Sequence, residues 1–255
     1  MHFEVSGEGS PILLIHGFCE TSAIWGNLRQ ELAKKHQVIL IDLPGFGKSP
    51  LTTPDLSLTD VATSIHHLLK GLDISACFII GHSLGGYVAM AYASKYTESV
   101  LGIGLFHSTA FPDSLEKKET REKGIEHVST HGMSSFSKGF VPNLFYAKNH
   151  SLFVEEMEGL KKEAAKTPLD TFIAYSRAMK NRMDTTDVFS KLEKPVFIIA
   201  GENDNAVPIA QSLELISQIN NGDSLVLSET GHMGFIEKEA ETTGFIKRFL
   251  TNFSI

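Results

Sequence analysis

Short apolar runs alternate along the chain with segments whose apolar residues recur at helical spacing. Runs without a charged residue occupy positions 11–15, 37–41, 76–80, 100–106 and 195–200. Continuous runs of this kind are typical of strands in a parallel sheet that is buried on both faces. The pattern therefore predicts an α/β fold with a doubly wound, mostly parallel sheet.

The helices expected between these strands are amphipathic. Helical spacing of apolar residues is found at positions 24–36, 58–69, 87–96 and 209–219, and again in a closing helix that ends near residue 250. Two further short strands are expected, at residues 3–5 and 224–227. Each expected helix except the closing one separates two strands, as a doubly wound sheet requires.

The alternation stops between residues 109 and 187. Two stripes of apolar residues at helical spacing occur there, one from Phe153 to Ala164 and one from Phe172 to Met179. We expect a helical cap inserted at 109–187 into a core made of 1–108 and 188–255. Such an insertion would lie over the carboxyl ends of the strands, where sheets of this type bind ligands.

Composition limits the classes of partner. The chain has 255 residues, 42% hydrophobic, with a formal net charge of −7. This acidic balance argues against nucleic acid and anionic membrane surfaces and favours small-molecule substrates. The N-terminus shows no basic segment followed by an apolar stretch, so a cytoplasmic location is expected. The two cysteines, Cys19 and Cys77, are expected to be free thiols.

A candidate nucleophile lies in Gly81-His82-Ser83-Leu84-Gly85, between an apolar run and a helical segment. A serine on a sharp turn between strand and helix needs small residues two positions away on each side, and Gly81 and Gly85 provide them. The free amide of Leu84, at the start of the helix, could donate to an oxygen that becomes negative during attack.

An acid and a histidine follow in the loops after later strands. Asp204 comes shortly after the run that ends at Ala200, and His232 lies between the last strand and the last helix. Either residue alone could be an ordinary turn aspartate or an exposed loop histidine. Together with Ser83 they occur in the order serine, acid, histidine, each after an expected strand.

At this point the chain resembles the α/β-hydrolase fold family over essentially its whole length. The resemblance rests on His16-Gly17, the Asp42 to Ser49 loop, the elbow around Ser83, the Gly201 to Pro208 loop and Gly231-His232. It implies that Ser83 is the nucleophile, His232 the general base and Asp204 the residue that orients His232. It further implies a second oxyanion amide at Phe18, beside that of Leu84, and identifies the insertion as the family's variable cap.

Other candidates fit less well. Gly47-Lys48-Ser49 lacks the glycine spacing of a phosphate-binding loop, and Asp42 is more suited to holding its own glycine-rich loop. Glu202 is the nearest rival acid. The pairs His66/His67 and His127/His131 do not form a metal site, because the first two point to different helix faces and Gly132 makes a continuous helix doubtful after the second. His16 and His82 are expected to be structural, and no cofactor or metal is expected.

The expected activity is hydrolysis of a small, apolar carboxylic ester through an acyl-enzyme. Aromatic and aliphatic residues between Phe136 and Tyr146 suggest an apolar pocket, although most could simply pack the cap onto the core. The same triad also serves carbon-carbon bond hydrolysis, lyase reactions and perhydrolysis, and a receptor without turnover is a further alternative. No arginine lies beside the elbow to mark a substrate that carries a carboxylate. The oligomeric state is not predicted.

Overall fold

A computed structural model describes all residues, 1–255. Its single sheet contains β1 (Phe3–Ser6), β2 (Pro11–Ile15), β3 (Gln37–Ile41), β4 (Cys77–His82), β5 (Val100–Phe106), β6 (Val196–Gly201) and β7 (Gly222–Leu227). The spatial order is β1-β3-β2-β4-β5-β6-β7. Only β1 runs antiparallel to its neighbour, and the remaining pairs are parallel. The expected doubly wound, mostly parallel sheet is confirmed.

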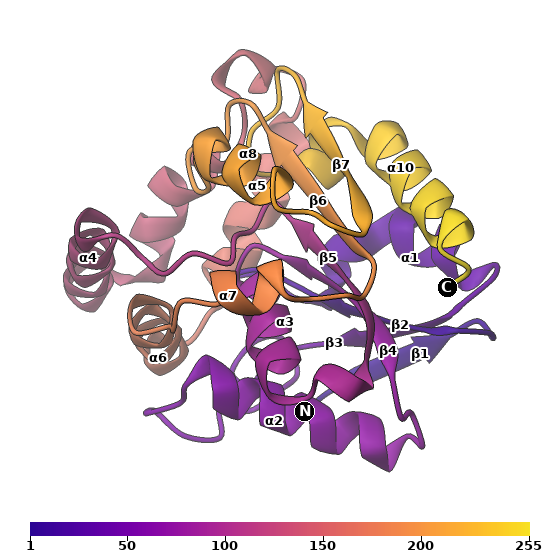
Figure 1. Cartoon of the computed structure of the whole chain (residues 1–255). Coiled ribbons are helices and arrows are strands. Elements are labelled where there is room, and N and C mark those ends of the chain that lie inside the picture. Colours follow the sequence, from indigo (N-terminus) through magenta and orange to yellow (C-terminus); the bar gives the residue numbers. More distant parts are fainter.

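Helices cover both faces of the sheet. The helices of the chain are α1 (Gly26–Ala33), α2 (Leu58–Gly71), α3 (Leu84–Lys95), α4 (Leu115–Phe140), α5 (Val154–Ala164), α6 (Leu169–Lys180), α7 (Thr186–Ser190), α8 (Ile209–Ile216), α9 (Gly234–Glu237) and α10 (Glu239–Asn252). Short 3₁₀ turns include η1 (Ser22–Trp25), η2 (Thr97–Ser99), η3 (Pro142–Leu144) and η4 (Ala147–Asn149). Helices α1 and α10 lie together on one face, while α2 and α3 lie on the other (Figure 1).

Successive residues of the central strands point to opposite faces and fill two separate cores. Leu13 and Ile15 belong to the apolar cluster that includes α2, α3 and α8. Ile12 and Leu14 belong to the cluster that includes α1 and α10. Both faces of β2 are therefore buried, which explains why its sequence is a continuous apolar run rather than an alternating one.

The strands lie where they were expected to within two residues, whereas the helices differ more, and α4 was not expected as a helix. The segment expected as one helix at 24–36 is a 3₁₀ turn, η1, followed by α1. Gly132 has φ 77° and ψ 164° and interrupts the helical backbone of α4, as its sequence suggested. Helices α4, α5 and α6 lie within the segment 109–187. None of the helices is both long and apolar enough to cross a membrane.

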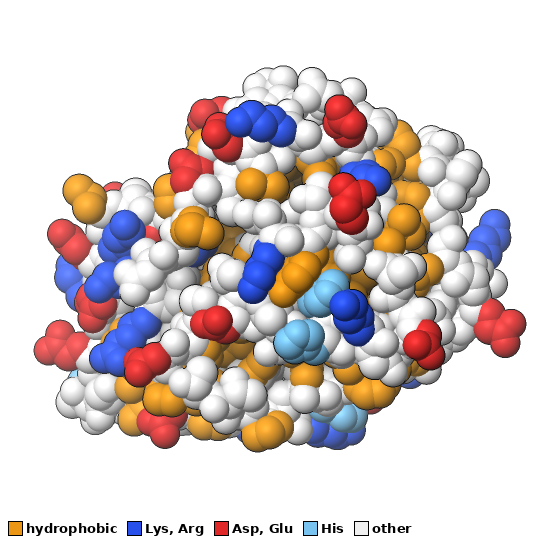
Figure 2. All heavy atoms as spheres, turned by 60° about the horizontal axis from the view of Figure 1, so that its bottom comes forward, with side chains coloured by type: hydrophobic (Ala, Val, Ile, Leu, Met, Phe, Trp, Pro, Cys, Tyr) orange, Lys and Arg blue, Asp and Glu red, His pale blue; other side chains and the backbone are white.

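Acidic and basic side chains are interspersed on the face of the molecule in Figure 2. Neither sign forms a continuous stripe on that face. A nucleic-acid surface would gather lysine and arginine on one side, so this face gives no support to such a partner. Both cysteines are free thiols, as expected, and both are buried.

Candidate active site

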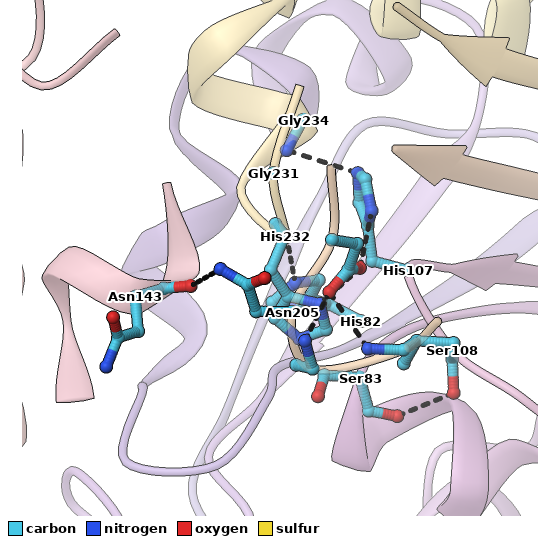
Figure 3. Close-up of polar contacts among 12 residues, drawn as sticks. His82, Ser83, His107, Ser108, Asn143, Asn205, Gly231, His232 and Gly234 are labelled. Atoms are coloured by element: carbon cyan, nitrogen blue, oxygen red, sulfur yellow. Dashed lines mark hydrogen bonds and ion pairs between the residues drawn. The ribbon is translucent and has the colours of Figure 1, made fainter. Parts of the chain in front are cut away.

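Ser83 lies at a sharp turn between β4 and α3 with an unusual backbone conformation. Its φ of 50° and ψ of −115° fall in a region that residues with a side chain rarely adopt. The turn is held by hydrogen bonds from the Ser83 amide to the carbonyl of Phe106, 3.0 Å, and from the Ser108 hydroxyl to the Ser83 carbonyl, 2.7 Å (Figure 3). Strain of this kind persists only where the surroundings enforce it, and it is common at functional sites.

Glycine is required on both sides of this turn by close backbone packing. A Cβ atom at Gly81 would lie 2.3 Å from the carbonyl carbon of Gly85, and one at Gly85 would lie 2.2 Å from the carbonyl oxygen of Ile15. These contacts are far shorter than any real carbon contact. The small residues predicted around Ser83 are therefore a steric necessity.

Asp204 and His232 are joined directly. His232 Nδ1 lies 2.7 Å from Asp204 Oδ2, and both side chains are buried. The other carboxylate oxygen, Oδ1, accepts the amides of Ala206 at 2.7 Å and Val207 at 2.9 Å. The carboxylate therefore holds the proton of the imidazole on Nδ1 and leaves Nε2 as the basic nitrogen.

A second histidine, which no motif marks in the sequence, also contacts the acid. His107 directly follows β5, has φ 48°, and its Nδ1 lies 3.2 Å from Asp204 Oδ2. Its Nε2 accepts the amide of Gly234 at 3.2 Å, so the proton must reside on Nδ1 (Figure 3). His107 is thus a neutral donor to the carboxylate. The one sequence signal for a functional role of His107 was its position directly after the apolar run 100–106.

The electrostatics of this group follow from burial and hydrogen bonding. Burial lowers the pKa of His107 to about 4, against the opposing effect of Asp204. Burial alone would raise the pKa of Asp204, but the neighbouring His232 and His107 rings outweigh it and hold that pKa below its usual range. Asp204 is therefore an anion with four hydrogen-bond donors, whereas His107 stays neutral near pH 7.

His82, next to Ser83, belongs to a different buried pair. Its Nδ1 lies 3.0 Å from Glu20 Oε2, and its Nε2 lies 3.1 Å from the backbone carbonyl oxygen of His232. Both partners can only accept hydrogen bonds, so both ring nitrogens carry protons and the ring is cationic. Burial opposes this charge, but the Glu20 carboxylate raises the pKa of His82 above its usual value. His82 is therefore structural, as expected, although it contacts the backbone of the candidate base.

The loop that begins at His16 carries one of the two candidate oxyanion amides. His16 Nε2 accepts the amide of Leu43 at 2.9 Å, and the Gly17 amide donates to Glu20 Oε2 at 2.6 Å. Among the backbone hydrogen bonds of turns and loops, neither the Phe18 nor the Leu84 amide is a donor. Both amides therefore remain available to a ligand.

Ser83 and His232 line one cavity of about 590 Å³ together with residues of the segment 109–187. Its apolar wall contains Phe18, Phe136, Phe140, Leu144, Phe172 and Met179. Three residues of the cap segment expected to form an apolar pocket, Phe136, Phe140 and Leu144, thus line the cavity. Val141 and Phe145 are instead buried in the core. No hydrogen bond joins Ser83 to His232 in this structure; a contact of this kind often tightens only when substrate binds.

The segment 109–187, the candidate cap, is hydrogen-bonded directly to the loops that carry Asp204 and His232. The His232 amide donates to the Leu144 carbonyl at 2.6 Å, and the Asn205 side chain donates to the Asn143 carbonyl at 3.2 Å (Figure 3). Glu237 accepts the amides of Gly231 at 2.8 Å and Tyr146 at 3.0 Å. These contacts fix the loop around His232 from the cap side.

One cluster has the composition of a metal site. The ligand atoms of His107, Asp204 and His232 lie within 4.8 Å of one another. Both Nδ1 atoms, however, lie at hydrogen-bond distance from Asp204 Oδ2 and carry the protons of those bonds. The donor set therefore fits a proton-bearing network better than a metal ion.

The remaining candidates take the places expected of them. Asp42 accepts the amides of Ser22 and Lys48 at 2.9 Å each and so holds its glycine-rich loop. Glu202 is exposed. A further cavity of about 500 Å³, beside the N-terminus of α2, includes none of the candidate catalytic residues.

Known proteins resemble the chain over nearly its full length. It is 26% identical to a pimeloyl-[acyl-carrier protein] methyl ester esterase of Aeromonas salmonicida, over 96% of both chains. It is 24% identical to a 2-hydroxy-6-oxononadienedioate/2-hydroxy-6-oxononatrienedioate hydrolase of Paraburkholderia xenovorans, over 99% of this chain and 91% of that protein. The structure of a malate-bound thermophilic esterase from Thermogutta terrifontis superimposes with a TM-score of 0.93 and 29% identity, over 99% of this chain and 93% of that one.

Other relatives match only in part. Three uncharacterized mycobacterial proteins are 41% identical over 98 residues, which is 38% of this chain and 29% of theirs.

A family model described as alpha/beta hydrolase fold matches residues 10–239. The match agrees with the seven-stranded sheet and the turn at Ser83. The chain therefore belongs to the alpha/beta hydrolase fold family.

Proposed function

We propose that the chain hydrolyses small carboxylic esters through an acyl-enzyme formed on Ser83. The observation that carries this proposal is the 2.7 Å contact between His232 and Asp204 beside a strained serine that lines the same cavity. Serine is a weak nucleophile at neutral pH and needs an oriented base nearby. The named relatives include an esterase, which agrees with this chemistry.

In the proposed reaction, Ser83 Oγ attacks the ester carbonyl carbon and gives its proton to His232 Nε2. The carbonyl oxygen becomes negative and accepts hydrogen bonds from the Phe18 and Leu84 amides, each such donor contributing about 10²–10³ in rate. His232 then gives the proton to the leaving alkoxide. A water molecule, activated by the same nitrogen, releases the acid and restores Ser83.

We also propose that residues 1–108 and 188–255 form the hydrolase core and residues 109–187 the cap. The cap supplies three of the four phenylalanines of the cavity wall, Phe136, Phe140 and Phe172, whereas Ser83, Asp204 and His232 follow strands of the core. This division assigns chemistry to the core and substrate selection to the cap. Small-molecule substrates of limited length fit a cavity of about 590 Å³.

The test is intact-mass analysis after treatment with a fluorophosphonate, followed by assays with esters of graded acyl length. We expect one adduct on the native protein and none on Ser83→Ala or His232→Ala. Absence of an adduct on the folded native protein would contradict the proposal and favour a binder without turnover. The hydrolase of P. xenovorans makes carbon-carbon bond hydrolysis the second candidate, which an adduct without ester turnover would support.

A further inference from the structure

Two basic side chains of the cap line the cavity that contains Ser83. Lys117 and Arg121 lie one turn apart on α4 and therefore occupy the same side of the helix. Both line the cavity together with Ser83 and His232. The sequence around the elbow contains no arginine, but the fold brings these two cations to it from the cap.

Arg121 belongs to a cluster with more positive than negative charge. Its Nε donates to Asp113, and Arg182 donates to the same carboxylate. The side chain of Asp113 is fully buried. Two guanidinium groups thus share one carboxylate, and one positive charge of the cluster has no anionic counterpart.

The two arginines differ in what they leave free. Arg182 donates to the carbonyls of Phe111 and Met179 as well as to Asp113. Its guanidinium also stacks on the Tyr87 ring, 4.0 Å from the centroid. Arg121 donates only to Asp113, and its side chain is 14% exposed. Arg182 is therefore committed to structure, whereas Arg121 faces the cavity with donors to spare.

Lys117 has no carboxylate partner. Its ammonium donates to the backbone carbonyl of Ala206 and takes part in no ion pair. An ammonium has three donors, so two remain for a ligand. The one acidic side chain that lines the cavity, Glu20, is paired with His82. The cap side of the cavity therefore carries an excess of positive over negative charge.

We propose that Lys117 and Arg121 bind a carboxylate at the far end of the substrate, so that the preferred esters are half-esters of small dicarboxylic acids. This inference rests on the proposed ester hydrolysis at Ser83. A planar guanidinium matches a carboxylate geometrically, and an ammonium adds charge from any direction. Phe136, Phe140 and Phe172 provide apolar contact for the methylenes between the two ends.

The test compares two esters that differ only at the end of the acyl chain. The 4-nitrophenyl ester of valeric acid ends in a methyl group, and the mono-4-nitrophenyl ester of glutaric acid ends in a carboxylate. The readout is the ratio of their kcat/KM values, glutarate over valerate. We expect Lys117→Gln to lower this ratio by about tenfold or more, because hydrogen bonds to charged groups are lost. Glutamine keeps a polar side chain with a hydrogen-bond donor at this position, so the variant chiefly removes the charge.

Lys123→Gln is the matched control, since Lys123 is exposed on the same helix and does not line the cavity. It should leave the ratio unchanged. If Lys117 only fastens the cap, Lys117→Gln will slow both esters alike and the unchanged ratio will overturn the inference. Raising the salt concentration to about 0.5 M should lower the ratio of the native protein, which gives a test without any substitution.

Failure of the proposed ester hydrolysis can be told apart from failure of the carboxylate site. If neither ester is hydrolysed, calorimetry with glutarate still tests whether Lys117 and Arg121 bind a carboxylate. Binding to the native protein that weakens in Lys117→Gln would support the carboxylate site while contradicting ester hydrolysis. Equal binding to both proteins, or none to either, would overturn the inference itself.

Discussion

His82 and Glu20 form an ion pair inside the core, with Nδ1 3.0 Å from Oε2 and both side chains buried. Glu20 Oε2 also accepts a hydrogen bond from the Gly17 amide. On the other side of the ring, His82 Nε2 donates to the His232 backbone carbonyl. Two loops that come from distant parts of the chain are thereby joined. One carries the candidate oxyanion amide of Phe18, and the other carries the candidate base.

Glu20→Gln should destabilise the protein strongly. It leaves the His82 cation buried without its counter-charge, and breaking a buried pair costs about 3–5 kcal/mol. The free energy of unfolding in urea measures the effect. Glu158→Gln is the control, because Glu158 pairs with Lys161 at the surface, and it should change stability little. Equal stabilities of the two variants would show that the buried pair contributes no more than an exposed one.

The stability of this pair should depend on pH in a defined window. The pKa of Glu20 is lowered from 4.5, because the His82 charge and hydrogen bond outweigh the effect of burial, so its contribution is lost as pH falls. The pKa of His82 is raised from 6.5, so its contribution is complete below that value and is lost as pH rises through the folded-state pKa. The difference in unfolding free energy between the native protein and Glu20→Gln should therefore be largest between about pH 4.5 and pH 6.5. It should shrink toward alkaline pH. A difference that grows above neutral pH would contradict this assignment.

Ser83→Gly should be more stable than Ser83→Ala. The φ of 50° at this position is unfavourable for any residue with a Cβ atom, and glycine relieves about 1 kcal/mol of such strain. Melting temperatures of the two variants measure the difference, and neither should react with a fluorophosphonate. If alanine is equally stable, the turn at Ser83 is not strained.

The sequence was sufficient for the sheet and for the three candidate residues because each of these depends on local signals. Apolar runs marked the strands, and Ser83, Asp204 and His232 each follow a run at the same edge of the sheet. The pairing of His82 with Glu20 spans 62 positions, and no local pattern specifies it. Helix α4 itself was not predicted, because its first half is a charged segment without an apolar stripe, so its placement beside the cavity was not predictable either. Lys117 and Arg121 were missed for this reason.

Asp204→Asn should lower kcat by about 10³–10⁴ while leaving the fold intact. Asparagine presents either an oxygen or an amide to the Nδ1 atoms of His107 and His232, which both donate to one oxygen in the native protein. It also lacks the charge that stabilises a protonated His232 during the reaction. Steady-state kinetics with a neutral ester measure the loss, and circular dichroism checks the fold. Glu202→Gln is the control for the rival acid two positions earlier, which is exposed, and it should retain full activity. A large loss in Glu202→Gln with activity kept in Asp204→Asn would reverse the assignment of the acid.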